Sequence, residues 1–149
     1  MVATWKESVE VLVDLFKSDW LRANTSNIQP VVIDIADDRG ERGKRLDFAR
    51  HDYVLLYETA HNEEVPDLFY NYVTTRINVT VDIRTIKSRT HLQKMENETR
   101  RAIHAKRKGD GANYDRLLFK TRTDLSDRTK KLFRHTFQVE VITLAELIP

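Results

Sequence analysis

The sequence contains no cysteine among its 149 residues, so disulfide bonds, thiolate metal sites and cysteine nucleophiles are excluded. The absence fits folding in the cytoplasm without requiring it. Glycine and proline are scarce, with four and three residues, which argues against extensive low-complexity disorder. No apolar run approaches the roughly 20 residues that span a bilayer. The stretch MVATWKESVEVLV lacks the basic segment and continuous apolar core of a signal peptide. We therefore expect no contact with a membrane.

Sequence motifs of common enzyme classes are also missing. The chain has no glycine-rich phosphate loop and no G-x-S-x-G nucleophile turn. Its histidines show no metal-ligand spacing such as H-x-x-x-H; they are His51, His61, His91, His104 and His135. His135 falls on the apolar side of an expected strand, where a buried or edge histidine is the common outcome. We therefore expect a protein that is not an enzyme, with no catalytic residues, no cofactor and no metal.

An acidic cluster at the end of the first expected strand raises one enzymatic alternative. Asp34, Asp37 and Asp38 could hold a divalent cation, as aspartates do in nucleases of the restriction type. Those nucleases place a Glu-x-Lys motif on the following strand, but this chain has no Glu-x-Lys anywhere. The pattern therefore favours the solvated edge of a loop over a metal-dependent nuclease.

What the sequence does contain is typical of a charged globular protein. Hydrophobic residues make up 40% and charged residues 32% of a chain whose length fits one domain over residues 1–149.

The net charge of +2 hides an asymmetry between the two halves of the chain. Residues 1–75 carry 8 basic and 14 acidic side chains, whereas residues 76–149 carry 17 basic and 9 acidic ones. The basic half could face nucleic acid. Alternatively, the two halves could meet across subunits packed head to tail, the arrangement that closes rings.

Apolar residues at helical spacing predict two helices. The first, over residues 5–22, follows a capping box of Thr4 and Glu7. Its apolar stripe consists of Trp5, Val9, Leu12, Val13, Phe16 and Trp20. The second helix, over residues 90–108, begins with Thr90 as its cap and ends before Gly109, a residue suited to stopping a helix.

Five strands are predicted, over residues 29–35, 52–59, 77–84, 117–122 and 133–144. Residues 53–57 are apolar on both faces, which predicts a central strand covered on each side. Residues 77–84 alternate between an apolar face and a polar, wet face. Residues 62–72 are ambiguous, and Pro66 could begin a short helix there. Asp124 to Asp127 supply turn residues for the last hairpin. The order α-β-β-β-α-β-β predicts an α+β fold, with a largely antiparallel four- to five-stranded sheet covered by two main helices.

Two groups of charged residues are candidate contact surfaces. The segment 37–50 is long for a hairpin connection and has the composition of an exposed, flexible loop. It either orders against a neighbouring subunit or stays a disordered surface loop; its charged members include Asp37, Asp38, Arg39, Glu41, Arg42, Lys44 and Arg45. The second group is basic and comprises Arg100, Arg101, Lys106, Arg107, Lys108, Arg128, Lys130, Lys131 and Arg134. No helix-turn-helix or RNA-recognition motif accompanies it, so we favour an assembly surface, or one near passing DNA, over a sequence-reading site.

Several short strings, taken in order, resemble one family. They are YVLLYETAHNE, INVTVDIRT, HLQKMENETRRAIHAKR and NYDRLLFKTRTDLSDRTKKLFRHTFQVEVITL, and the resemblance spans roughly residues 29–144. Together they resemble the tail terminator, or tail-completion, proteins of tailed bacterial and archaeal viruses. In that family a strand ending in a polar Asp-x-x-Thr leads into the helix that begins the second half. A Tyr-Asp-x-Leu segment, a Leu-Ser-Asp-like turn and a basic-aromatic strand then close the sheet.

The resemblance implies a virion protein, assembled in the host cytoplasm, whose copies form a ring that is usually a hexamer. The ring would cap the head-proximal end of the tail tube, stop its polymerisation and join the tail to the neck. Its partners would be further copies of the chain, the tube protein, the neck or connector protein, and genomic DNA that passes through the lumen without being read by sequence. The family pattern carries no catalytic residue onto this chain. The alternatives are another head–tail connector component, or a nucleic-acid-binding module that uses the basic half.

Overall fold

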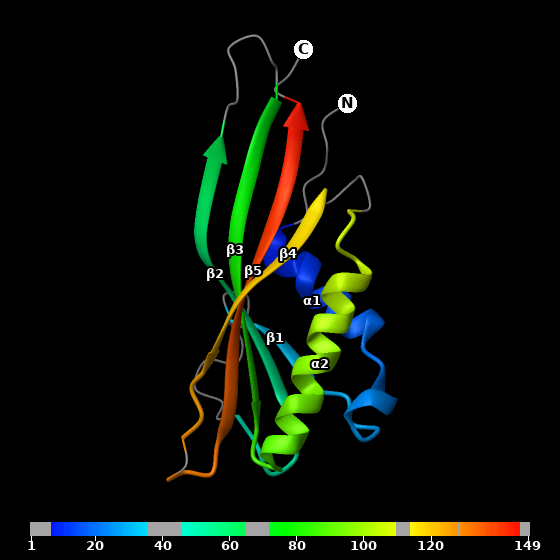
Figure 1. The fold of residues 1–149 in the computed structure, drawn as a ribbon, viewed down its shortest axis with the longest axis vertical. Coiled ribbons are helices and arrows are strands. Elements are labelled where there is room, and N and C mark those ends of the chain that lie inside the picture. The colour runs from blue at the N-terminus through cyan, green and yellow to red at the C-terminus, as the bar shows by residue number, and fades with distance from the viewer. Residues whose placement is uncertain (1–6, 36–45, 65–71, 110–113, 128, 147–149) are drawn as a thin grey trace.

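The computed structural model describes residues 7–35, 46–64, 72–109, 114–127 and 129–146. Five strands form one sheet in the order β1-β2-β3-β5-β4, and two helices lie against one of its faces (Figure 1). Along the chain the elements are α1 (Ser8–Asp19), the 3-10 helix η1 (Arg22–Thr25), β1 (Val31–Asp34), β2 (Tyr53–Glu64), β3 (Tyr72–Thr85), α2 (Arg89–Ala105), β4 (Arg116–Asp124) and β5 (Phe133–Glu146). The predicted α+β fold and the order of its main elements are confirmed.

The strand β3 lies at the centre of the sheet. It pairs antiparallel with β5 along its whole length and antiparallel with β2 from Thr74 to Arg84. The strand β4 pairs antiparallel with the other side of β5, whereas β1 pairs parallel with the first residues of β2. The sheet is therefore mixed, with β1 as its one parallel strand among the residues described.

The hydrophobic core fills the space between the sheet and the two helices. Val79, Val81 and Ile83 of β3 are all 0% exposed, so the apolar face predicted for residues 77–84 is confirmed. Further core side chains are Leu12 and Phe16 of α1, Leu92, Met95 and Ile103 of α2, Leu117 of β4, and Phe137, Val139 and Val141 of β5. Removal of this apolar surface from water is the main source of stability.

Two strands are longer than the sequence predicted. The strand β2 continues to Glu64 and β3 begins at Tyr72, whereas the predicted strands ended at residue 59 and began at residue 77. The added end of β2 is polar and exposed from His61 onward, so hydrophobic periodicity gives no signal for it. Pairing across the strands, such as Glu63 opposite Thr75, holds it extended. Pro66 lies outside the described residues.

The helix ends also differ from the predicted ones. The Ser88 hydroxyl accepts a hydrogen bond from the His91 amide at 3.0 Å, so Ser88 rather than Thr90 caps α2. In the first helix, Glu7 is the residue before α1 and its side chain makes no capping hydrogen bond, so its predicted place inside a capping box is wrong. The helix ends at Asp19 rather than at residue 22, and Thr4 lies outside the described residues. The helix α2 ends at Ala105 because the following backbone pairs with the start of β4. There, a Cβ atom on Gly109 would collide with a neighbouring backbone carbonyl, so close approach requires glycine at this position.

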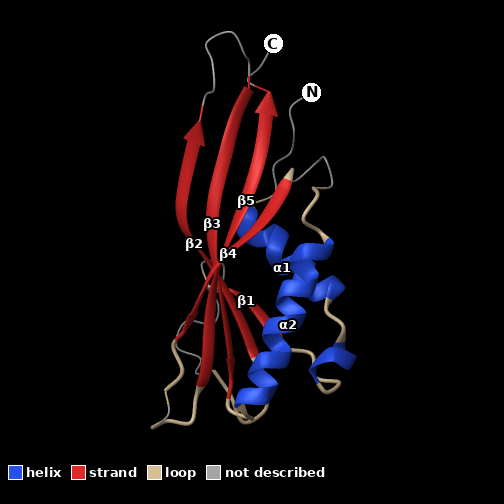
Figure 2. Ribbon diagram, in the orientation of Figure 1, coloured by secondary structure: helices blue, strands red, loops and turns tan. Residues whose placement is uncertain are grey.

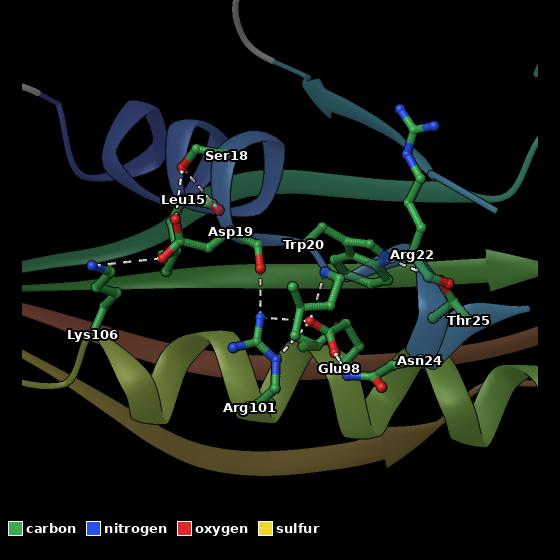
Figure 3. Close-up of polar contacts among 12 residues, drawn as sticks. Leu15, Ser18, Asp19, Trp20, Arg22, Asn24, Thr25, Glu98, Arg101 and Lys106 are labelled. Carbon is green, nitrogen blue, oxygen red and sulfur yellow. Dashed lines mark hydrogen bonds and ion pairs between the residues drawn. The ribbon is translucent and has the colours of Figure 1, made fainter. Parts of the chain in front are cut away.

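A buried carboxylate joins the first helical segment to α2 (Figure 3). The Glu98 side chain is 0% exposed. Its oxygens accept hydrogen bonds from the Leu21 amide at 3.0 Å, the Asn24 side-chain amide at 2.6 Å and the Arg101 guanidinium at 2.7 Å. Burial acts to raise the pKa of Glu98, but these hydrogen bonds outweigh burial and lower the pKa. Arg101 also donates to the Asp19 carbonyl, so one cluster fixes the end of α1 and η1 on α2.

We predict that Glu98→Ala lowers the free energy of unfolding by about 2–3 kcal/mol, because it leaves several donors without their acceptor. Urea denaturation followed by circular dichroism measures the change. Glu10→Ala is the matched control, since Glu10 is exposed on α1, and we expect it to cost about 0.5 kcal/mol or less. Equal effects of the two substitutions would contradict the role assigned to Glu98.

Candidate assembly surfaces

The basic residues predicted to form a contact surface do not form one patch. Four of them are in ion pairs within the chain, which are Arg100–Glu96 (3.4 Å), Arg101–Glu98 (2.6 Å), Lys106–Asp19 (3.8 Å) and Arg134–Asp82 (2.8 Å). Arg100 also lies over the ring of Phe119, with its guanidinium carbon 4.7 Å from the ring centroid. These four cations therefore stabilise the subunit itself.

The other described residues of the predicted basic surface are exposed and fall into two groups at opposite ends of β4. Arg107 and Lys108 lie beside the start of β4, where the backbone of Lys108 pairs with that of Arg116. Lys130 and Lys131 lie in the turn that follows the end of β4. Since β4 has nine residues, its ends are roughly 26 Å apart. Arg128 lies outside the described residues. We call Arg107, Lys108 and Arg116 the basic corner.

Most of the predicted loop over residues 37–50 also lies outside the described residues, including Asp37, Asp38, Arg39, Glu41, Arg42, Lys44 and Arg45. Its described end packs on the sheet. The Phe48 ring meets Tyr53 edge-on at 5.3 Å, and the Asp47 amide donates to the Tyr53 hydroxyl at 2.7 Å. Within the described ranges, no group of three or more His, Asp or Glu side chains is placed to hold a metal ion. Of the suggested acidic cluster, Asp34 ends β1, whereas Asp37 and Asp38 lie outside the described residues.

The sheet face away from the helices is polar but closely paired. Two buried carboxylates, Asp82 of β3 and Glu140 of β5, each lie between two cations. The pairs are Arg84–Asp82 and Arg134–Asp82 at 2.8 Å, Arg76–Glu140 at 2.8 Å and Lys120–Glu140 at 2.6 Å. Burial acts to raise the pKa of Glu140, but hydrogen bonds from Lys120 and Arg76 outweigh it, and the pKa is lowered. The polar face of β3, predicted to be wet, thus holds the fully buried Asp82.

The strand β2 extends beyond the helices (Figure 2), and its residues after Leu56 form an acidic edge. The strand β1 pairs only with Tyr53–Leu56, so the outer edge of β2 beyond these residues lacks a partner strand among the residues described. Three carboxylates project from this stretch. Glu58, Glu63 and Glu64 have side chains that are 47%, 62% and 64% exposed. We call them the acidic edge; sequence reasoning missed it because the predicted strand ended too early.

Another buried carboxylate, that of Asp52, connects the start of β2 to the start of α2. Asp52 is 2% exposed. Its Oδ1 accepts hydrogen bonds from the Thr85 hydroxyl and the Lys87 ammonium, both at 2.7 Å, and its Oδ2 lies 2.6 Å from His91 Nε2. Burial acts to raise the pKa of Asp52, but these partners outweigh it and the pKa is lowered. Both oxygens are occupied by protein donors, so the arrangement ties the start of β2 to the segment that begins α2.

His135 lies in a third charged cluster, beneath the irregular part of β4. It is 2% exposed, as its apolar position in the sequence predicted. Burial, and then the charge of Arg122, lower the pKa of His135, so its ring is neutral at pH 7. Arg122 Nη2 donates to His135 Nε2 at 3.3 Å, which places the ring proton on Nδ1, 3.6 Å from a Glu96 oxygen. The cluster ties β4 and β5 to α2.

We predict that acid weakens the fold partly through Asp52. Because its folded pKa lies below the ordinary value of 3.8, the unfolded chain binds more protons as the pH falls. The stabilisation is therefore complete above that value and is lost as the pH falls through the lower folded pKa. In urea titrations between about pH 7 and pH 2, Asp52→Asn should be less stable at neutral pH and should lose less stability in acid. Glu63→Gln, at an exposed site, should keep the wild-type slope; an unchanged slope in Asp52→Asn would contradict the assignment.

In comparisons with known proteins, no family model matches this sequence, and no curated protein matches it significantly. None of the described helices is long and apolar enough to cross a membrane.

Proposed function

We propose that this chain is a structural subunit of a viral tail, whose copies form a ring at the head-proximal end of the tail tube. The ring ends polymerisation of the tube and joins the tail to the neck or connector. Support comes from the sequence strings that resemble tail terminator proteins and from an element order that agrees with that resemblance. Such a function requires contact surfaces and no bond-making chemistry.

The observation that carries the proposal is the shape of the sheet. The strands β2, β3 and β5 extend well beyond the ends of both helices (Figure 2). Among the residues described, this three-stranded part of the sheet has a strand edge without a partner, which is a ready site for contact with another chain. The polar end of β2 also contributes little apolar surface to burial within its own subunit, so burial stabilises it little. A subunit that stacks between the tube and the connector requires a projecting surface of this kind for its contacts.

The proposed mechanism is steric. One face of the ring matches the last ring of tube subunits, and the other face rejects further tube subunits while it accepts the connector. DNA passes through the lumen, where cations neutralise phosphate charge without reading bases. Among the residues described, the open sheet face has Arg76, Arg84, Arg134 and Lys120 around the carboxylates of Asp82, Glu140 and Glu64. The excess of one positive charge is compatible with this position.

A nucleic-acid-binding module is the second candidate, and the same positive excess favours it. Against it, the exposed cations Arg107 and Lys108 lie far from Lys130 and Lys131, and most other basic residues of the predicted surface are in ion pairs. A dedicated binder would show a steep salt dependence in titrations with duplex DNA. A ring subunit that only surrounds DNA should bind free duplex weakly at every salt concentration.

The test is assembly. The purified chain should form rings with a central hole, seen by light scattering and negative-stain microscopy, either alone or on purified tail tubes of the virus that encodes it. Tubes mixed with the chain should carry density at one end and should stop adding tube subunits. A chain that stays monomeric over a wide concentration range and leaves tube growth unchanged would overturn the proposal.

A further inference from the structure

The acidic edge and the basic corner lie at the same level on opposite edges of the sheet. The strand register aligns Asn62 of β2 with Arg76 of β3, Arg76 with Ile142 of β5, and Ile142 with Arg116 of β4. Asn62 immediately precedes Glu63 of the acidic edge. The two surfaces therefore share one row of the sheet and are separated by three strand spacings, or roughly 14 Å.

Charge of one sign predominates on each surface. The three cations of the basic corner are exposed, and Asp115 is the neighbouring carboxylate among the residues described. The acidic edge contributes three carboxylates. His61 lies between two of them, 3.7 Å from Glu58 and 3.3 Å from Glu63. Glu64 is 3.9 Å from Arg76, whose closer partner is Glu140. Most of the negative charge of the edge is thus left without a cation in the subunit, among the residues described.

The acidic edge also borders a hollow of about 330 Å³. Glu7 and Ser8 at the start of α1 form one wall, and His61, Glu63 and Thr75 of the sheet form another. The Glu7 carboxylate adds negative charge and offsets the positive end of the α1 dipole. The hollow is large enough for a lysine or arginine side chain, which would meet carboxylates on two sides.

We propose that copies of the chain join head to tail, with the basic corner of one copy against the acidic edge and hollow of the next. This inference rests on the proposed ring and specifies its contact. Because the two surfaces lie at opposite edges of one sheet, each copy has one surface for each neighbour, as a closed ring requires. A two-fold dimer through either surface would place like charges together, which is unfavourable.

Charge reversal tests the contact. The double variants Glu63→Lys/Glu64→Lys and Arg107→Glu/Lys108→Glu should each self-associate about tenfold or more weakly than the wild type, since each brings like charges together. Lys130→Glu/Lys131→Glu is the matched control, because it reverses two exposed cations at the other end of β4. Sedimentation velocity measures association, and circular dichroism confirms that each variant is folded. Wild-type association should also weaken as salt is raised.

The decisive experiment is to mix the two double variants. In an equimolar mixture the two variants can alternate. The reversed edge of the first variant then faces the reversed corner of the second, and the unchanged corner of the first faces the unchanged edge of the second. Every contact between unlike variants therefore joins opposite charges. Assembly should return in the mixture, with the two variants in equal amounts. A loss of folding cannot produce this rescue.

The outcomes separate this inference from the proposed function. If the wild type forms rings and the double variants associate as strongly as it does, or if mixing restores nothing, the proposed contact is wrong while the ring remains. If the wild type never associates, alone or on tubes, both proposals fail.

Discussion

The pairing of β3 between β2 and β5 is the constraint on which the rest of the structure depends. It fixes which side chains face the helices, because successive residues of a strand point to opposite faces. One face of β3 therefore supplies Val79, Val81 and Ile83 to the core, while Asp82 lies on the other. The same pairing carries the strands beyond the helices, where cross-strand hydrogen bonds keep the polar end of β2 extended. It also sets the row that places the acidic edge opposite the basic corner.

Charge is used in two different ways in this chain. Carboxylates at Asp52, Asp82, Glu98 and Glu140 are buried, and each is surrounded by cations or amide donors. Burying them unpaired would cost several kcal/mol each, so their partners are committed to the fold. The charges of the acidic edge and the basic corner are exposed. This division explains how a chain with a net charge of only +2 can present two strongly charged and unlike surfaces.

Sequence patterns predicted the parts of the fold that burial dictates. The helices, the order of the elements and the apolar face of residues 77–84 all follow from hydrophobic spacing. The extension of β2 over His61–Glu64, the parallel pairing of β1 and the capping role of Ser88 could not be predicted in this way, because they depend on which segments meet in space. The partners of the basic residues could not be predicted from the sequence for the same reason. Charge alone grouped Arg101 and Arg134 with Arg107, but only the structure shows that the first two are committed to Glu98 and Asp82.

The central claim is that unlike edges of one sheet meet between neighbouring copies. Zero-length carbodiimide cross-linking, which joins a lysine to a carboxylate in direct contact, tests it most directly. Assembled protein made from equal amounts of light and heavy isotope-labelled chains would be cross-linked, digested and analysed by mass spectrometry. The account predicts mixed-isotope cross-links between Lys108 and Glu63 or Glu64. Assembled rings whose mixed-isotope cross-links all join other residues would contradict it.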